Sequence, residues 1–251
     1  MLKVFAVQKF KASILSTRPI NEAFIEEAAK KNILIDVLSF IETEIIDSIE
    51  VYEEIENALL ETATVVFTSM NAVEAVAAHL NNYKPDWSIY CIGNTTKKLV
   101  KEYFGEELIA ETGDNANELA RKIIEDDITD EVIFFCGDKR RDELPALLNK
   151  NDINVNEIEV YQTNMIHRTI EKNYDGILFF SPSAAESFFS NNKVNDKAIL
   201  FAIGNTTASA IKKYLPADKA GLSNKIIVAD EAGKSNLVEK AIAYFTSFKN
   251  L

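Results

Sequence analysis

One short motif occurs twice in the sequence, each time at nearly the same distance from a second repeated segment. Ile-Gly-Asn-Thr-Thr occupies residues 92–96 and returns at residues 203–207, while residues 64–72 are similar to residues 176–184. From Ser69 to Gly93 is 24 residues, and from Ser181 to Gly204 is 23. Two similarities in the same register are hard to obtain by chance, so they predict a duplicated unit and a chain of two similar lobes.

Short apolar runs alternate with amphipathic helical patterns along the chain, which is typical of an α/β protein. Several runs are apolar throughout, as expected for parallel strands with helices on both faces of the sheet. The pattern therefore predicts an α/β fold with two similar parallel-sheet lobes and flanking helices. The expected helices include residues 20–31 and 144–150, and the expected strands are residues 4–7, 34–38, 64–68, 88–92, 132–136, 157–161, 176–180 and 199–203.

Charge and composition exclude several classes of function. The formal net charge is −12 and no long basic run occurs, so neither nucleic acid nor an anionic membrane is an expected partner. No apolar run reaches the roughly 18 residues needed to cross a bilayer, and the N-terminus lacks the pattern of a signal peptide. We therefore expect a cytoplasmic protein. Glycine occurs only 8 times, without a dinucleotide-binding turn or a P-loop, so no nucleotide cofactor is expected.

The two cysteines, Cys91 and Cys136, each lie in an apolar run, which predicts buried strand residues rather than a disulfide. His79 and His167 are far apart and show no metal-ligand spacing, so no metal site is expected. A Cys/His nucleophile pair is the alternative that the sequence leaves open.

The repeated motifs follow predicted strands, where ligands bind in parallel α/β sheets and helix N-termini present free N–H groups. Taken singly, each hydroxyl in these motifs is explained as a helix cap. Asn71 and Ser183, each followed three residues later by Glu, are the expected N-caps. The whole set, repeated in both lobes, instead predicts a cleft that binds carboxylate or phosphate. Its hydroxyls are those of Ser69, Thr95, Thr96, Ser181, Ser183, Thr206 and Thr207.

Three further side chains are candidates beside these hydroxyls. The basic run at residues 139–141 follows a predicted strand, and it is either a solvated loop or a source of one or two cations for an anionic ligand; Arg141 is the member we select. Arg18, just before Pro19, is the candidate cation of the other lobe. Tyr161, near the end of its strand, is a hinge residue, a core residue or a hydroxyl donor to the ligand.

Six segments together resemble one enzyme family. They are residues 66–69 (Val-Phe-Thr-Ser), 92–96, 135–137 (Phe-Cys-Gly), 160–163 (Val-Tyr-Gln-Thr), 179–183 (Phe-Phe-Ser-Pro-Ser) and 202–207 (Ala-Ile-Gly-Asn-Thr-Thr). Each segment alone is unspecific. Their order and spacing along the whole chain are similar to those of uroporphyrinogen-III synthase.

The resemblance implies a crossed organisation in which residues 1–38 and 164–251 form one lobe and residues 39–163 the other, joined by two strand-like linkers. It also implies a cyclising lyase that converts hydroxymethylbilane to uroporphyrinogen III in the cleft between the lobes, with loss of water and inversion of ring D. No cofactor or metal would be needed. The small-molecule substrate would be the main partner, a transient contact with the preceding enzyme of the pathway is left open, and nothing demands more than a monomer.

Residue roles also follow from the resemblance. Tyr161 would assist loss of the substrate hydroxyl, by hydrogen bonding rather than full proton transfer, because a phenol with a pKa of about 10 is a weak acid. The serine and threonine hydroxyls named above, together with Arg18, would bind substrate carboxylates. The main alternative is a non-catalytic two-lobed anion-binding or sensor module, which would explain the duplication but not the series of six segments. A nucleotide-dependent enzyme of similar topology is disfavoured by the missing phosphate loop.

Overall fold

The computed structural model describes residues 10–93, 95–127, 129–215, 224–230 and 233–247. The chain divides into two compact units. Unit 1 is made of residues 1–42 and 164–251, and unit 2 of residues 43–163. The chain thus enters unit 2 after Glu42 and leaves it after Thr163, so that unit 1 is discontinuous in sequence.

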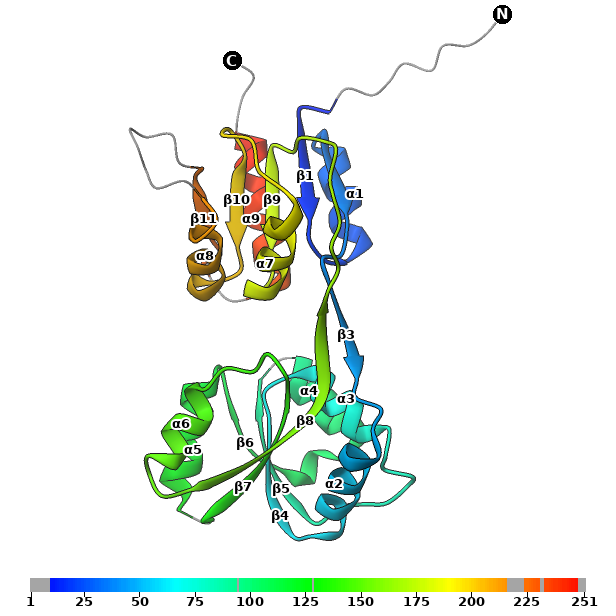
Figure 1. Cartoon of the computed structure of the whole chain (residues 1–251), viewed down its shortest axis with the longest axis vertical. Coiled ribbons are helices and arrows are strands. Elements are labelled where there is room, and N and C mark those ends of the chain that lie inside the picture. The colour runs from blue at the N-terminus through cyan, green and yellow to red at the C-terminus, as the bar shows by residue number, and fades with distance from the viewer. Residues whose placement is uncertain (1–9, 94, 128, 216–223, 231–232, 248–251) are drawn as a thin grey trace, which may run out of the picture. The chain divides into compact units, whose positions relative to one another are not determined.

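Unit 1 contains a five-stranded sheet of order β11-β10-β9-β1-β2, in which every pairing is parallel. Helices α1 and α9 supply the apolar side chains on one face of this sheet, and α7 and α8 those on the other. Figure 1 shows the alternation of strands and helices. The elements are β1 (Ala12–Ser16), α1 (Glu22–Lys30), β2 (Ile33–Val37), β9 (Gly176–Phe179), α7 (Pro182–Asn191), β10 (Ile199–Ala202), α8 (Asn205–Lys212), β11 (Ile226–Val228) and α9 (Lys234–Ser247).

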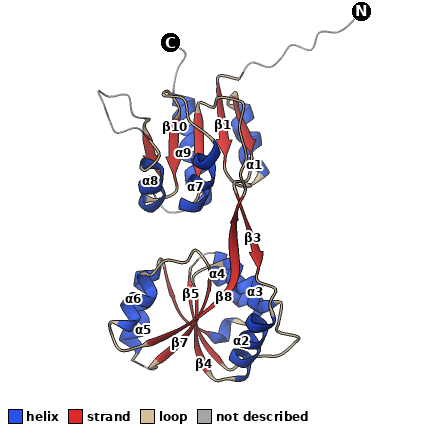
Figure 2. Cartoon of the chain, in the orientation of Figure 1, coloured by secondary structure: helices blue, strands red, loops and turns tan. Residues whose placement is uncertain are grey.

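Unit 2 is built around a six-stranded sheet of order β3-β8-β7-β4-β5-β6. Helices α2, α3 and α4 cover one face, and α5 and α6 cover the other. Figure 2 shows the same layering by secondary structure. The elements are β3 (Ile41–Ile45), α2 (Ile49–Leu60), β4 (Ala63–Phe67), α3 (Met70–Ala77), β5 (Trp87–Ile92), α4 (Thr95–Tyr103), the 3-10 turn η1 (Glu106–Leu108), β6 (Ile109–Gly113), α5 (Ala116–Asp126), β7 (Glu131–Gly137), α6 (Glu143–Asn149) and β8 (Asn154–Met165).

Strands β3 and β8 pair where the chain passes between the units. The N–H of Ile46 donates to the carbonyl of Val160, and the N–H of Ile166 donates to the carbonyl of Phe40. Residue numbers rise along one strand as they fall along the other, so this pair is antiparallel. The remaining neighbours in the sheet of unit 2 pair in parallel. The expected α/β fold with two parallel-dominated sheets and flanking helices is confirmed.

Each unit has its own apolar core on both faces of its sheet. In unit 2, Phe135 stacks on Phe67 with ring centroids 5.5 Å apart and lies 5.8 Å from Trp87. In unit 1, Phe188 makes edge contacts with Phe40 at 5.2 Å and with Phe179 at 5.4 Å. Because both faces are covered, the central strands are apolar along their length, which is the pattern that the sequence showed.

The first strand is placed differently from the expectation. The expected strand at residues 4–7 lies outside the described residues, and the strand that precedes α1 is β1. β1 pairs with β2 on one side and β9 on the other, so it is a central strand despite the polar Ser13 and Ser16. Both serine hydroxyls are hydrogen-bonded: that of Ser13 donates to the distant Asp175 (3.0 Å), and that of Ser16 donates to the carbonyl of Arg18 two residues on (2.6 Å).

Both cysteines are free and buried, Cys91 in β5 and Cys136 in β7. Burial raises the pKa of Cys91 to about 11 and that of Cys136 to about 12. We expect neither thiol to react with an aromatic disulfide reagent at pH 8 in the folded protein, and both to react in denaturant. Rapid labelling of the native protein would contradict this, and would revive the nucleophile pair that the sequence left open.

Candidate functional site

The motif residues lie at the edge of each sheet where its parallel strands end, called here the C-terminal edge. In unit 2, β4 leads to Ser69, β5 leads to Gly93, and β7 ends at Gly137. In unit 1, β9 leads to Ser181 and β10 leads to Gly204. Helices begin directly after Ser69, Ser181 and Gly204, and α4 begins at Thr95, two residues after Gly93. The first-turn N–H groups of these helices lack intrahelical partners at this edge.

The two motif serines cap helices, but at positions different from those expected. Ser69 is the N-cap of α3, with its hydroxyl accepting from the N–H of Asn71 (3.2 Å). Ser181 is the N-cap of α7, with its hydroxyl accepting from the N–H of Ala184 (3.1 Å). The expected caps at Asn71 and Ser183 were therefore wrong by two residues in each case. Ser183 lies in the first turn of α7 and is partly buried.

The Tyr161 ring in unit 2 lies over the backbone of Gly137. Tyr161 is opposite Gly137 in the pairing of β8 with β7, where the register shifts. A Cβ atom added to Gly137 would lie 2.3 Å from Cζ of Tyr161 and 2.8 Å from its hydroxyl oxygen. The missing side chain of Gly137 therefore makes the space in which the Tyr161 ring lies.

The surroundings of Tyr161 keep its phenol protonated. Burial is the largest influence and raises the pKa of Tyr161, while a hydrogen-bonding interaction with the Ser69 side chain acts in the opposite direction. The charge of Asp138 adds to the increase. At neutral pH this hydroxyl is a hydrogen-bond donor and not a base.

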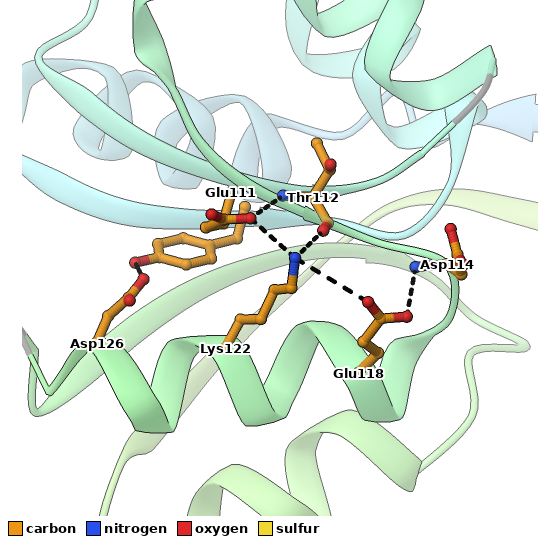
Figure 3. Close-up of polar contacts among 7 residues, drawn as sticks. Glu111, Thr112, Asp114, Glu118, Lys122 and Asp126 are labelled. Atoms are coloured by element: carbon orange, nitrogen blue, oxygen red, sulfur yellow. Dashed lines mark hydrogen bonds and ion pairs between the residues drawn. The ribbon is translucent and has the colours of Figure 1, made fainter.

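The end of β6 is fixed beside the first Gly-Asn-Thr-Thr motif. The carbonyl of Gly113 accepts from the N–H of Gly93 (2.9 Å). Figure 3 shows how α5 holds this strand: Nζ of Lys122 donates to the carbonyl of Thr112 (2.8 Å) and to Glu111 (2.9 Å). Glu118 of the same helix accepts from the N–H of Asp114 (3.0 Å). These contacts position the end of β6, where the carbonyl of Gly113 accepts the hydrogen bond from Gly93.

The three cations of the basic run after β7 all lie within 4.0 Å of acidic side chains of the same unit. Arg140 forms ion pairs with Glu157 and Asp142. Lys139 lies 3.5 Å from Asp138. Arg141 is 56% exposed in its side chain and lies 4.0 Å from Glu143. In the described part of the chain, no hydrogen bond or ion pair joins Arg141 to Ser69 or Tyr161, so its role as a substrate ligand stays a prediction.

The paired threonines divide into accessible and inaccessible members. Thr95 and Thr206 are exposed in the first turns of α4 and α8, whereas Thr96 is only 7% exposed and Thr207 only 2%. The same division in both copies means that a ligand can reach the first hydroxyl of each motif but not the second. Gly204, the N-cap of α8, has extended backbone, and a Cβ atom added there would meet nothing within 4 Å. Gly204 therefore leaves open space beside the N-terminus of α8, through which a ligand can approach the backbone.

Arg18 lies at the C-terminal edge of unit 1, just after β1. Its guanidinium lies 5.9 Å from the centre of the Phe180 ring, and burial lowers its pKa. The preceding Thr17 is held by its hydroxyl, which donates to the carbonyl of Leu178 (2.7 Å). The turn is therefore anchored to β9. The sequence identified Arg18 but not its aromatic neighbour, nor the role of Gly137 under Tyr161, since both depend on contacts between distant segments.

Metal-binding clusters and membrane-spanning helices are both absent from the part of the chain that the structure describes. No group of three or more histidine, cysteine, aspartate or glutamate side chains in that part of the chain could hold a metal ion. None of the helices described is both long enough and apolar enough to cross a membrane.

Comparisons with known proteins agree on one family. The family model described as uroporphyrinogen-III synthase HemD matches residues 22–220. The crystal structure of uroporphyrinogen-III synthetase from Helicobacter pylori is similar with a TM-score of 0.63 and 17% identity, covering 93% of this chain and 99% of that one. A mutant uroporphyrinogen III synthase from the extremely thermophilic bacterium Thermus thermophilus gives 0.62 and 14%, covering 95% and 100%. At these identities the two structures show the fold.

Proposed function

Because the chain belongs to the uroporphyrinogen-III synthase family of cyclising lyase-type enzymes in haem biosynthesis, we propose that its C-terminal edges bind hydroxymethylbilane. The substrate loses its terminal hydroxyl as water, and ring closure with inversion of ring D gives uroporphyrinogen III. We assign assistance of hydroxyl loss to Tyr161. The carboxylates are assigned to backbone N–H groups and hydroxyls of both units.

The observation that best supports the role of Tyr161 is the position of its ring in the space left by Gly137, where burial raises the pKa of the phenol and the Ser69 side chain interacts with it. A neutral phenol can donate a hydrogen bond to the hydroxyl as its C–O bond breaks. The cation left behind is consumed by formation of the ring-closing C–C bond, and the proton that the pyrroles then release balances the hydroxide as water. The rest of the acceleration is a matter of placement, because holding the reacting carbons together supplies up to about 7–11 kcal/mol.

The carboxylates can be bound despite the acidic chain. Exposed charges beyond a Debye length of about 8 Å are largely screened at physiological salt. A hydrogen bond to a charged group contributes about 1.5–3 kcal/mol. The ligand groups that the structure leaves accessible are the exposed Thr95 and Thr206, the open backbone at Gly204, and the first turns of α3 and α7. Thr96 and Thr207 remain in the proposal only through their backbone N–H groups.

Turnover of freshly prepared hydroxymethylbilane, with the isomers separated after oxidation, tests the function directly. We expect predominantly the type III isomer, formed faster than the spontaneous type I product. Only type I, at the spontaneous rate, would contradict the assignment, and tight binding without turnover would then favour the anion-binding module. A cytoplasmic location, a monomeric state and a transient contact with the enzyme that supplies the substrate are further parts of the proposal.

A further inference from the structure

The turn that carries Arg18 is held in place, and among the described residues its side chain has no counter-ion. The Ser16 hydroxyl donates to the carbonyl of Arg18 (2.6 Å), and Thr17 is anchored to Leu178, so the turn that carries the guanidinium is fixed at both of the preceding residues. The Nε atom of Arg18 is buried and has no hydrogen-bond partner, and no carboxylate in the described part of the chain pairs with this side chain. A buried guanidinium donor without an acceptor is costly, so the arrangement favours an anion brought from outside.

A second cation lies close to the first. Lys234 is the first residue of α9, the helix that follows β11, so it lies at the same C-terminal edge as Arg18. The Phe180 ring, over which the Arg18 guanidinium lies, belongs to the same apolar cluster as Leu237 and Val238 in the first turns of α9. Lys234 is an exposed residue, and partial burial and then the charge of Arg18 lower its pKa, in agreement with two cations at the same edge of the sheet.

Nothing in the described part of the chain neutralises this pair. The other lysine of α9, in the middle of the helix, behaves differently: Lys240 forms an ion pair with Asp230 at 2.5 Å. No ion pair involving Lys234 is found among the described residues. Helix α9 has 14 residues, and its first N–H groups add partial positive charge beside Lys234. Two like charges beside a helix N-terminus favour the binding of an anion at this place.

We propose that Arg18 and Lys234 together bind one carboxylate of the tetrapyrrole substrate, which makes Lys234 a substrate-binding residue that the sequence motifs do not reveal. This inference rests on the proposed function, because it takes the octacarboxylate hydroxymethylbilane as the ligand. The fixed guanidinium supplies directed N–H donors, while the flexible ammonium closes on the same group from α9. The subsite binds substrate and takes no part in the chemical step.

The test compares Lys234→Gln with Lys240→Gln, the same substitution on the same helix, in steady-state turnover of hydroxymethylbilane. We expect Lys234→Gln to raise KM about tenfold, as for one lost hydrogen bond to a charged group, with kcat within twofold of the parent. Lys240→Gln should leave both parameters unchanged. Lys234→Arg, which keeps the charge, should hold KM near the parent value, and circular dichroism checks that each variant is folded.

A double variant separates a shared carboxylate from two independent ones. If Arg18 and Lys234 bind the same group, the fold-increase in KM of the double variant Arg18→Gln/Lys234→Gln should differ from the product of the two single fold-increases. An unchanged KM in folded Lys234→Gln, or a multiplicative effect in the double variant, would overturn the proposal while the parent still made type III product. Absence of type III product from the parent would instead show that the proposed function had failed.

Discussion

Leu59→Ala is expected to lower the free energy of unfolding of unit 2 by about 2–5 kcal/mol, the usual cost of truncating a buried leucine. Leu59 lies near the end of α2, is only 5% exposed, and belongs to the cluster that contains Phe67 and Phe135. Truncation would remove apolar contacts and leave a cavity beside the sheet. The cores of the two units contain no common residue, so the loss should be confined to unit 2.

The chain carries its own probe for this experiment. Trp87 is the only tryptophan, and it lies in the same cluster as Leu59, with its indole N–H donating to the carbonyl of Ala58 (2.9 Å). Its fluorescence in a urea titration therefore reports on unit 2. Leu60, the next residue, is 73% exposed, so Leu60→Ala should change stability by no more than about 0.5 kcal/mol. Equal shifts in the two variants would show that Leu59 is not a core residue.

The fold could be predicted because its strongest signals are local. Apolar runs such as residues 64–68 and 132–136 became β4 and β7, since strands covered on both faces must be apolar throughout. The missed strands include β3 and β11, which lack that signal. β3 reads Ile-Glu-Thr-Glu-Ile and is mostly exposed, and β11 is only three residues long. Their positions depend on pairing with β8 and β10, which no local pattern reveals.

The candidate site could be predicted only in part. Ser69 and Ser181 were placed correctly at strand ends, but the cap positions were wrong. Asn71 and Ser183 have the Glu three residues later that a capping box requires, whereas the true caps Ser69 and Ser181 lack it. Pro182 was the overlooked signal, since proline is favoured in the first helical turn after a cap. The proximity of Lys234 to Arg18, and of Gly137 to Tyr161, arises from residues far apart in sequence. No spacing rule could have given either pair.

Gly137→Ala is expected to lower kcat about 10- to 100-fold, as for a catalytic group displaced by about an ångström. The added methyl group would overlap the far end of the Tyr161 side chain, with contacts of 2.3 to 2.8 Å. A side-chain ring can swing aside more easily than backbone, so the main consequence is a displaced hydroxyl and a lost interaction with Ser69. Tyr161→Phe, which removes only the hydroxyl, should also slow the reaction without abolishing it. Both variants are measured by formation of the type III isomer.

The control for this effect is Gly137→Ala in a variant that lacks the Tyr161 ring. In a Tyr161→Ala background the space above Gly137 is empty, so adding Gly137→Ala should cause no further loss of kcat. A second loss of equal size in that background would mean that Gly137 acts through the strand backbone and not through Tyr161. Full activity of folded Gly137→Ala would contradict the catalytic role of Tyr161 itself, because the two groups cannot occupy the same space. The family assignment would then stand, with catalysis left to placement of the substrate alone.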